Sequence, residues 1–211
     1  METTLEALTA FGTIAVAVVA IWGDWLKSKL APQKLALELD PEAEPVTYSN
    51  GVRGIFRHLK VVNLRPWTPA QQCRVMLVGL SRRDPGGGYQ LVPIPFPCQF
   101  TWAPMEFMPT TLTVMKEQVV DFGFINKNAN IFLPKLYSMP YNFQCGVGKN
   151  EAIQYQLRIE AVNYISHTFV VEVAWDGVWD FDPNVMRHHL SANMVVRERR
   201  RVSSTSAVLA L

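Results

Sequence analysis

Three aspartates form the densest group of acidic side chains in the sequence. Asp176, Asp180 and Asp182 stand close together in the segment WDGVWDFD. Because Ca²⁺ prefers carboxylate oxygens as ligands, a loop of this kind is a candidate metal site. The spacing departs from the helix-loop-helix calcium pattern, and no glutamate closes the loop. Aspartate is also common in solvated turns, so a turn is the favoured interpretation and a metal site is the alternative.

The histidines do not follow a zinc-binding pattern. His188 and His189 are adjacent, whereas zinc sites on a helix need histidines on one face, as in H-E-x-x-H. His58 and His167 lie in or beside different predicted strands, so only the fold can bring them together. We expect each of them to be an ordinary surface or core histidine.

The cysteines lie in or beside apolar, strand-like segments, at positions Cys73, Cys98 and Cys145. An odd number at wide spacing argues against a disulfide framework and favours buried thiols in a reducing compartment. No local motif supplies a base for a cysteine nucleophile, and G-x-S-x-G and C-x-x-C are missing. The glycine run at residues 86–88 lacks the lysine of a phosphate-binding loop and is typical of a hairpin tip. We therefore predict no cofactor and do not expect an enzyme.

Length and composition indicate a globular chain. Its 211 residues suit one domain of roughly 150 residues with a short appendage. Hydrophobic residues make up 49% and charged residues 18%, which is an apolar excess. The formal net charge of +2 is too small to indicate a nucleic-acid-binding body, so no nucleic-acid partner is expected.

The apolar excess is concentrated near the N-terminus. Residues 7–23 read ALTAFGTIAVAVVAIWG and carry no charge, and about 17 such residues are the lower limit for crossing a bilayer. Glu2 and Glu6 precede this segment without any lysine or arginine, which argues against a cleavable signal peptide. A buried core helix is the alternative. We predict one transmembrane anchor helix within residues 1–31, in which the membrane-facing residues are Leu8, Phe11, Ile14, Val18, Ile21, Trp22 and Trp25.

The flanks of this segment predict its orientation. Lys27, Lys29 and Lys34 follow it, and no basic residue precedes it. Because positively charged flanks remain in the cytoplasm, we expect a single-pass protein with its C-terminal domain on the cytoplasmic side of the lipid bilayer. Small residues on one face of the helix suit self-association in lipid. They are Ala10, Thr13, Ala17 and Ala20.

Residues 32–196 are predicted to form one β-sandwich domain. Turn signals recur about every ten residues, and no long amphipathic helix is apparent. Pro41 and Pro45 are expected to end the first strand. The arrangement predicts two antiparallel sheets of about seven to nine strands. The clearest predicted strands are residues 34–40, 54–63, 73–80, 150–163 and 168–175.

Two stretches of this domain echo one another. HLKVVN followed by CRVMLVGL is mirrored by LRIEAVN followed by TFVVEVAW. Each has a strand, a connection marked by asparagine and a partner strand. With its V-x-N turns at Asn63 and Asn163 and a closing G-x-W motif at Gly177 and Trp179, the sequence resembles a set of uncharacterised bacterial proteins. In these, one N-terminal membrane span precedes an immunoglobulin-like domain. The resemblance implies an immunoglobulin-like antiparallel β-sandwich and an anchor, but no activity.

Residues 197–211 are predicted to be a flexible tail. Serines and a threonine follow a short basic run, and such composition does not support a packed core. Contact of the arginines with anionic lipid is an alternative to a solvated tail. The basic residues are Arg197, Arg199, Arg200 and Arg201.

Three functions are compatible with these features. The leading hypothesis is a membrane-tethered binding or scaffold protein that presents loops or a sheet edge to a protein partner. The second is an oligomeric membrane effector or pore component with a β-sandwich sensor domain. The third is an exported carbohydrate-binding module, which requires the opposite orientation and uses Trp67, Trp102 or Trp179.

Overall fold

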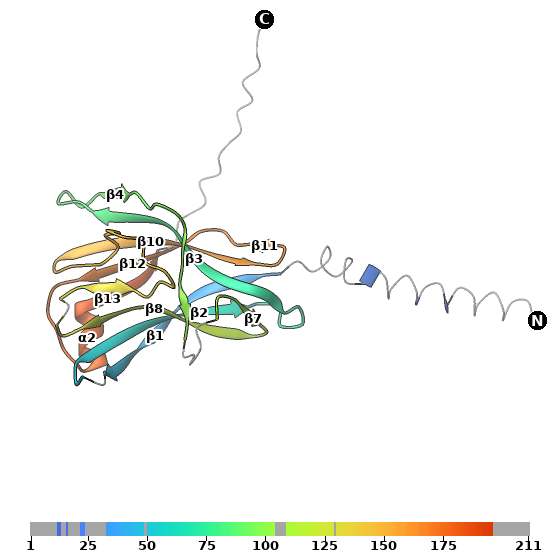
Figure 1. Cartoon of the computed structure of the whole chain (residues 1–211), viewed down its shortest axis with the longest axis horizontal. Coiled ribbons are helices and arrows are strands. Elements are labelled where there is room, and N and C mark those ends of the chain that lie inside the picture. The colour runs from blue at the N-terminus through green and yellow to red at the C-terminus, as the bar shows by residue number, and fades with distance from the viewer. Residues whose placement is uncertain are drawn as a thin grey trace, which may run out of the picture.

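The chain folds into two antiparallel sheets with one short helix (Figure 1). The computed structural model describes residues 12–13, 16, 22–23, 33–48, 50–103, 109–128 and 130–195. The prediction of an all-β, sandwich-like domain is confirmed. The elements are β1 (Leu35–Thr47), β2 (Arg53–Asn63), β3 (Ala70–Arg83), β4 (Tyr89–Val92), β5 (Cys98–Gln99), β6 (Thr101–Trp102), β7 (Leu112–Val114), β8 (Glu117–Asn126), β9 (Phe132–Pro134), β10 (Glu151–Ala161), β11 (Tyr164–Ile165), β12 (Phe169–Trp175), α2 (Pro183–His189) and β13 (Leu190–Val195).

The two sheets enclose an aromatic core. One sheet has the order β1-β2-β8-β6, with β9 beside β8, and the other has the order β13-β12-β10-β3-β4, with β11, β5 and β7 on its flanks. Phe122 is fully buried between them, and its ring centroid lies 5.4 to 5.8 Å from those of Phe100, Phe132 and Tyr155. Tilted and edge-on contacts of this kind are the arrangement that aromatic rings prefer.

The prediction that prolines end the first strand is wrong. Strand β1 continues through Pro41 and Pro45 to Thr47. It is the edge strand of its sheet, where the missing N–H of proline does not break a ladder on both sides. A register shift between Leu39 and Ala43 takes up the irregular stretch. The sequence pattern thus located a strand but not its length.

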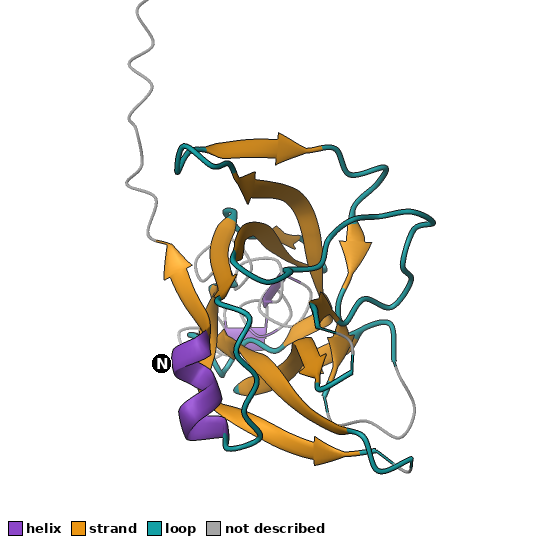
Figure 2. Ribbon diagram, turned by 90° about the vertical axis from the view of Figure 1, so that its left-hand side faces the viewer, coloured by secondary structure: helices purple, strands orange, loops and turns teal. Residues whose placement is uncertain are grey.

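A short helix joins the open sides of the two sheets. Helix α2 contacts β1 and β13, which are the edge strands of different sheets (Figure 2). It begins at Asp182, whose side chain accepts a hydrogen bond from the backbone N–H of Asn184, and Pro183 occupies its first turn. An aspartate cap followed by proline is a helix-start signal. No helix was predicted at this position, although Asp182 and Pro183 carry the signal.

The predicted anchor lies almost entirely outside the described residues. Trp22 and Thr13 are described and helical. No helix within the described part of the chain is long and apolar enough to cross a membrane. The transmembrane helix and the tail of residues 197–211 therefore stay predictions. The anchor and small-face residues outside the described set are Leu8, Phe11, Ile14, Val18, Ile21, Trp25, Ala10, Ala17 and Ala20.

The two echoing asparagines mark different connections. Asn63 ends β2, and the chain then crosses to β3 in the other sheet, whereas Asn163 turns the chain between β10 and β11 of one sheet. The buried Asn63 side-chain amide donates to the carbonyls of Thr68, Val114 and Met115 at 2.9 to 3.3 Å. Asn163 is exposed and has a φ of 58°. Asn63 therefore stabilises the connection between the two sheets, and Asn163 adopts the left-handed backbone conformation of a turn.

We expect Asn63→Ala to lower the free energy of unfolding by about 2 to 3 kcal/mol, because three carbonyls lose their donor within a buried connection. Urea denaturation followed by tryptophan fluorescence measures the change. Asn163→Gly is the matched control and should alter stability by less than about 0.5 kcal/mol, since glycine accepts positive φ. Equal losses in the two variants would show that Asn63 has no special role in the crossing.

Candidate functional site

Two register shifts flank strand β2 at the level of Arg57 and His58. One lies in β1 between Leu39 and Ala43, and the other lies between β2 and β8 at Arg57 and His58. Such bulges bend a strand and redirect its side chains. Gly123 belongs to the second shift, and a Cβ there would overlap the Phe132 ring. The glycine therefore lets β9 approach β8 closely beside the site.

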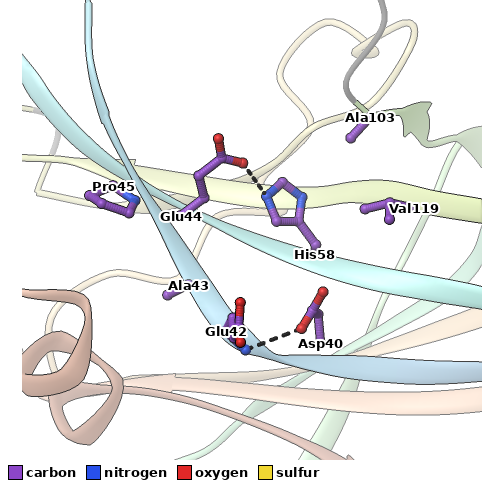
Figure 3. A pocket seen from close by; sticks show the side chains of 8 residues that line it. All are labelled: Asp40, Glu42, Ala43, Glu44, Pro45, His58, Ala103 and Val119. Atoms are coloured by element: carbon purple, nitrogen blue, oxygen red, sulfur yellow. Dashed lines mark hydrogen bonds and ion pairs between the residues drawn. The ribbon is translucent and has the colours of Figure 1, made fainter.

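A pocket opens on the outer face of the five-stranded sheet at these shifts (Figure 3). Leu59 of β2 faces the core, so the preceding residue, His58, faces outward. The pocket has a volume of about 380 Å³. Its lining contains three carboxylates and one imidazole. The lining residues are Asp40, Glu42, Ala43, Glu44, Pro45, His58, Ala103 and Val119.

His58 lies between two carboxylates. Its Nε2 is 3.1 Å from Glu44 Oε2, and its Nδ1 is 3.2 Å from Asp121 Oδ1. The first contact has hydrogen-bond geometry, while the second is an ion-pair approach without that alignment. Asp121 also pairs with Lys135 Nζ. The Asp121 side chain is buried and that of Glu44 is mostly exposed, so Asp121 is the stronger electrostatic partner.

The surroundings favour the charged form of His58. Burial alone would lower its pKa, but the close approach and charge of Asp121, and then the hydrogen bond and charge of Glu44, outweigh burial and raise the pKa above the ordinary 6.5. The pKa of Asp121 is lowered, because His58 and Lys135 outweigh the effect of its own burial. The three side chains thus stabilise one another's charges at one face of the sheet.

Aromatic and ionic contacts hold this network in place. The ring of Phe56 stacks on Phe124 at 5.4 Å and on His58 at 6.2 Å between centroids. Lys135 Nζ lies 5.1 Å above the Phe56 ring, a cation–π distance. At the other side of the pocket, Lys60 Nζ is 2.9 Å from Asp40 Oδ2. Strands β1, β2 and β8 therefore contribute to one connected charged surface.

The pocket suits binding better than covalent catalysis. Among its described lining residues there is no serine, threonine or cysteine that His58 could activate. The cysteines are buried elsewhere in the core, and burial raises the pKa of Cys73 to about 12 and that of Cys145 to about 11. Burial also raises the pKa of Cys98. Thiols of this kind stay protonated at neutral pH and are weak nucleophiles.

The three aspartates for which a metal site was the alternative to a solvated turn each contact local groups. Asp176 accepts from the backbone N–H of Val178 and pairs with His189 Nδ1 at 2.7 Å. Asp180 accepts from the N–H of Asp182, which itself caps helix α2. Within the described ranges, no group of three or more histidine, cysteine or acidic side chains could hold a metal ion. The turn interpretation accounts for all three positions, and the metal hypothesis gains no support.

The other candidate residues do not converge on one place. His167 packs on Phe169 at 4.2 Å and takes no part in the His58 contacts. Trp67 is exposed, Trp102 is buried in β6, and Trp179 lines a separate pocket. The tryptophans therefore do not form a common carbohydrate platform in the described structure.

Sequence reasoning did not find the partners of His58. The pattern predicted a strand over residues 54–63 that contains His58, and the structure places His58 in β2. Asp121 comes from β8 and Glu44 from β1, so neither is near His58 in the sequence. The signal available in the sequence was the alternation that places His58 between Phe56 and Lys60 on one face of the strand.

No protein-family model matches the chain, and no curated protein matches it. The resemblance to membrane-anchored immunoglobulin-like proteins therefore stays a prediction.

Arg57, next to His58, is a buried arginine with unmet hydrogen-bonding capacity. Its side chain points to the core side of β2, and the residue is only 5% exposed. Its Nε and Nη1 atoms have no hydrogen-bond partner in the described part of the chain. Burial lowers the pKa of Arg57, Asp40 partly offsets this effect, and Arg187 adds to it. The buried guanidinium of such a residue destabilises the fold, whereas the aliphatic part of its side chain stabilises the fold through packing.

We therefore expect Arg57→Met to leave the free energy of unfolding unchanged or to raise it by about 1 kcal/mol, because methionine fills the space of the stem without the charge. Arg57→Ala should instead lower it by about 2 kcal/mol through lost packing. Chemical denaturation of both variants tests the pair. A large loss in Arg57→Met would reveal a stabilising partner of the guanidinium.

The pKa of His58, measured by NMR titration, should lie above 6.5 and should fall in Asp121→Asn because burial is then opposed by Glu44 alone. Glu44→Gln should lower it less, since Glu44 is mostly exposed. Since the folded pKa is raised, the stabilisation from His58 is complete below pH 6.5 and is lost as the pH rises through the raised value. An equal or larger shift in Glu44→Gln would contradict this ranking of the partners.

Proposed function

We propose that the chain is a membrane-tethered binding or scaffold protein whose immunoglobulin-like sandwich receives a basic segment of a protein partner at the His58 pocket. The observation that carries this proposal is the acidic lining of the pocket. Asp40, Glu42 and Glu44 line it, and its described lining residues include no lysine or arginine. A cleft lined by one sign of charge concentrates the field and attracts ligands of the opposite sign.

The exposed carboxylates are placed to meet a partner. Glu42 and Glu44 are exposed, and Figure 3 draws both on β1 at the rim of the pocket. Asp40 is partly neutralised by Lys60, and Glu44 is partly neutralised by His58 when the imidazole is protonated. The negative charge of the pocket therefore depends on the protonation of His58.

The edge of strand β1 is a poorer docking place than its face. An exposed edge strand can pair with a strand of another chain through its free N–H and C=O groups. Pro41 and Pro45 have no N–H to offer, and the register shift after Leu39 bends the strand. The outer sheet face at the pocket is therefore a better docking place than the edge of β1.

Binding of the full-length protein to an array of short peptides tests the proposal. Peptides rich in lysine or arginine should bind preferentially. The double variant Glu42→Gln with Glu44→Gln should weaken their binding by about tenfold, as expected for the loss of two exposed charge contacts. Glu117→Gln removes an exposed acid outside the pocket and should have little effect.

The same binding should strengthen as the pH rises through the raised pKa of His58, because loss of the imidazolium leaves the pocket more negative. Affinity measured between pH 5.5 and about 8 reports this dependence. Selection of acidic peptides, or equal binding by the double variant, would refute a basic partner at this pocket.

No described feature favours either alternative function. The effector hypothesis depends on the small-residue helix face, of which only Thr13 is described. The carbohydrate-binding hypothesis needs several exposed aromatic rings at one place. Trp67 is exposed, but Trp102 is only 2% exposed and Trp179 lines a separate pocket.

A further inference from the structure

We infer that the end of the sandwich at which strand β1 begins lies against an anionic lipid surface. This inference rests on the membrane tether of the proposed function and adds which surface of the domain faces the bilayer. The predicted anchor by itself would allow the domain to hang in any orientation. The described residues at this end point to one orientation.

Five exposed apolar side chains define this surface, which we call the apolar end. Three connections carry four of them, namely β2–β3, β7–β8 and β10–β11, and Ile165 lies in the short strand β11. An exposed apolar patch is a feature of membrane and protein contact sites. The residues, with their exposed fractions, are Leu64 (44%), Trp67 (72%), Met115 (65%), Val162 (38%) and Ile165 (67%).

Hydrogen bonds hold the three connections together. The Asn63 amide reaches the Met115 carbonyl at 3.2 Å, which joins the β2–β3 connection to the β7–β8 turn. The N–H of Val162 donates to the carbonyl of Gln71 at 3.0 Å, which joins the β10–β11 turn to strand β3. Figure 1 shows β7, β11 and the beginning of β3 at the same end of the molecule. The apolar end is therefore one surface and not three separate tips.

The chain reaches the domain at this same end. Strand β1 begins at Leu35, whose N–H donates a hydrogen bond to the Tyr164 hydroxyl of β11 at 3.2 Å. Leu64 N–H donates to the carbonyl of Lys34 at 2.9 Å. The predicted span ends at Gly23, and ten further residues to Gln33 reach at most roughly 36 Å when fully extended. The tether therefore holds the apolar end near the bilayer.

Charge complementarity selects lipid as the occupant. Lys34 and Lys116 are exposed beside the apolar residues, because the N–H of Leu64 donates to the carbonyl of Lys34 and the N–H of Asn63 donates to that of Lys116. Glu117 is an exposed acid next to Lys116. Basic residues around tryptophan and aliphatic side chains match the arrangement found at membrane interfaces, where basic groups meet lipid phosphates. Arg74 and Arg158 nearby are already paired with Glu160.

Site-specific fluorescence quenching in vesicles tests the orientation. The full-length protein is reconstituted into phosphatidylcholine vesicles with and without phosphatidylglycerol, and an introduced cysteine at Met115→Cys carries an environment-sensitive dye. The three native thiols are at most 2% exposed, so they should react slowly. Leu91→Cys is the matched control, since Leu91 is 77% exposed and pairs with Ser81, which lies roughly 35 Å along β3 from Ala70.

Lipids that carry a quencher near the headgroup should quench the dye at position 115 several-fold more than the dye at position 91. Replacing phosphatidylglycerol by neutral lipid, or adding salt, should reduce the difference, as should Lys34→Glu with Lys116→Glu. Equal quenching at both positions in protein that has inserted would overturn this inference alone. Failure of the protein to remain with alkali-washed vesicles would overturn the membrane tether, and with it the proposed membrane function.

Discussion

The register shifts on both sides of strand β2 determine where polar groups enter this sandwich. A regular strand would continue the alternation of core and solvent faces in step with both neighbours. At Arg57 and His58 the partner strands slip, and these two consecutive polar side chains are both buried, one on each face of the sheet. His58 finds Asp121 and Glu44, while Arg57 keeps unmet donors. The same irregularity creates the pocket and the least satisfied residue of the described core.

The two neighbouring residues have different consequences, since His58 belongs to the pocket and Arg57 affects the stability of the fold. The outward face gains a histidine whose charge is sustained by carboxylates on the two neighbouring strands. The inward face carries a buried cation that a hydrophobic residue could replace. Proteins commonly retain irregular, strained or undersatisfied positions beside functional sites, where local cost accompanies useful geometry. The position of Arg57 directly behind His58 fits that relation.

Local patterns in the sequence were sufficient for elements whose neighbours are close in the chain. The alternation in residues 54–63, the glycine run at 86–88 and the pair β10–β12 all correspond to observed structure. Prediction failed where distant strands decide the outcome. The length of β1 depends on its edge position, and the environment of His58 depends on Asp121, which lies in a strand far along the chain. Bulges also change register by one residue, and composition does not reveal them.

The position of helix α2 means that the domain cannot finish folding until the end of its chain has been synthesised. It connects β1, the first strand of the domain, with β13, the last, across the open side of the two sheets. The side can close only after nearly the whole domain has left the ribosome, because contacts between chain ends must wait for the later residues. A chain held early at a membrane would thus expose its first strand until synthesis is almost complete. Pro41 and Pro45 on that strand would then protect the waiting edge from pairing with neighbouring chains.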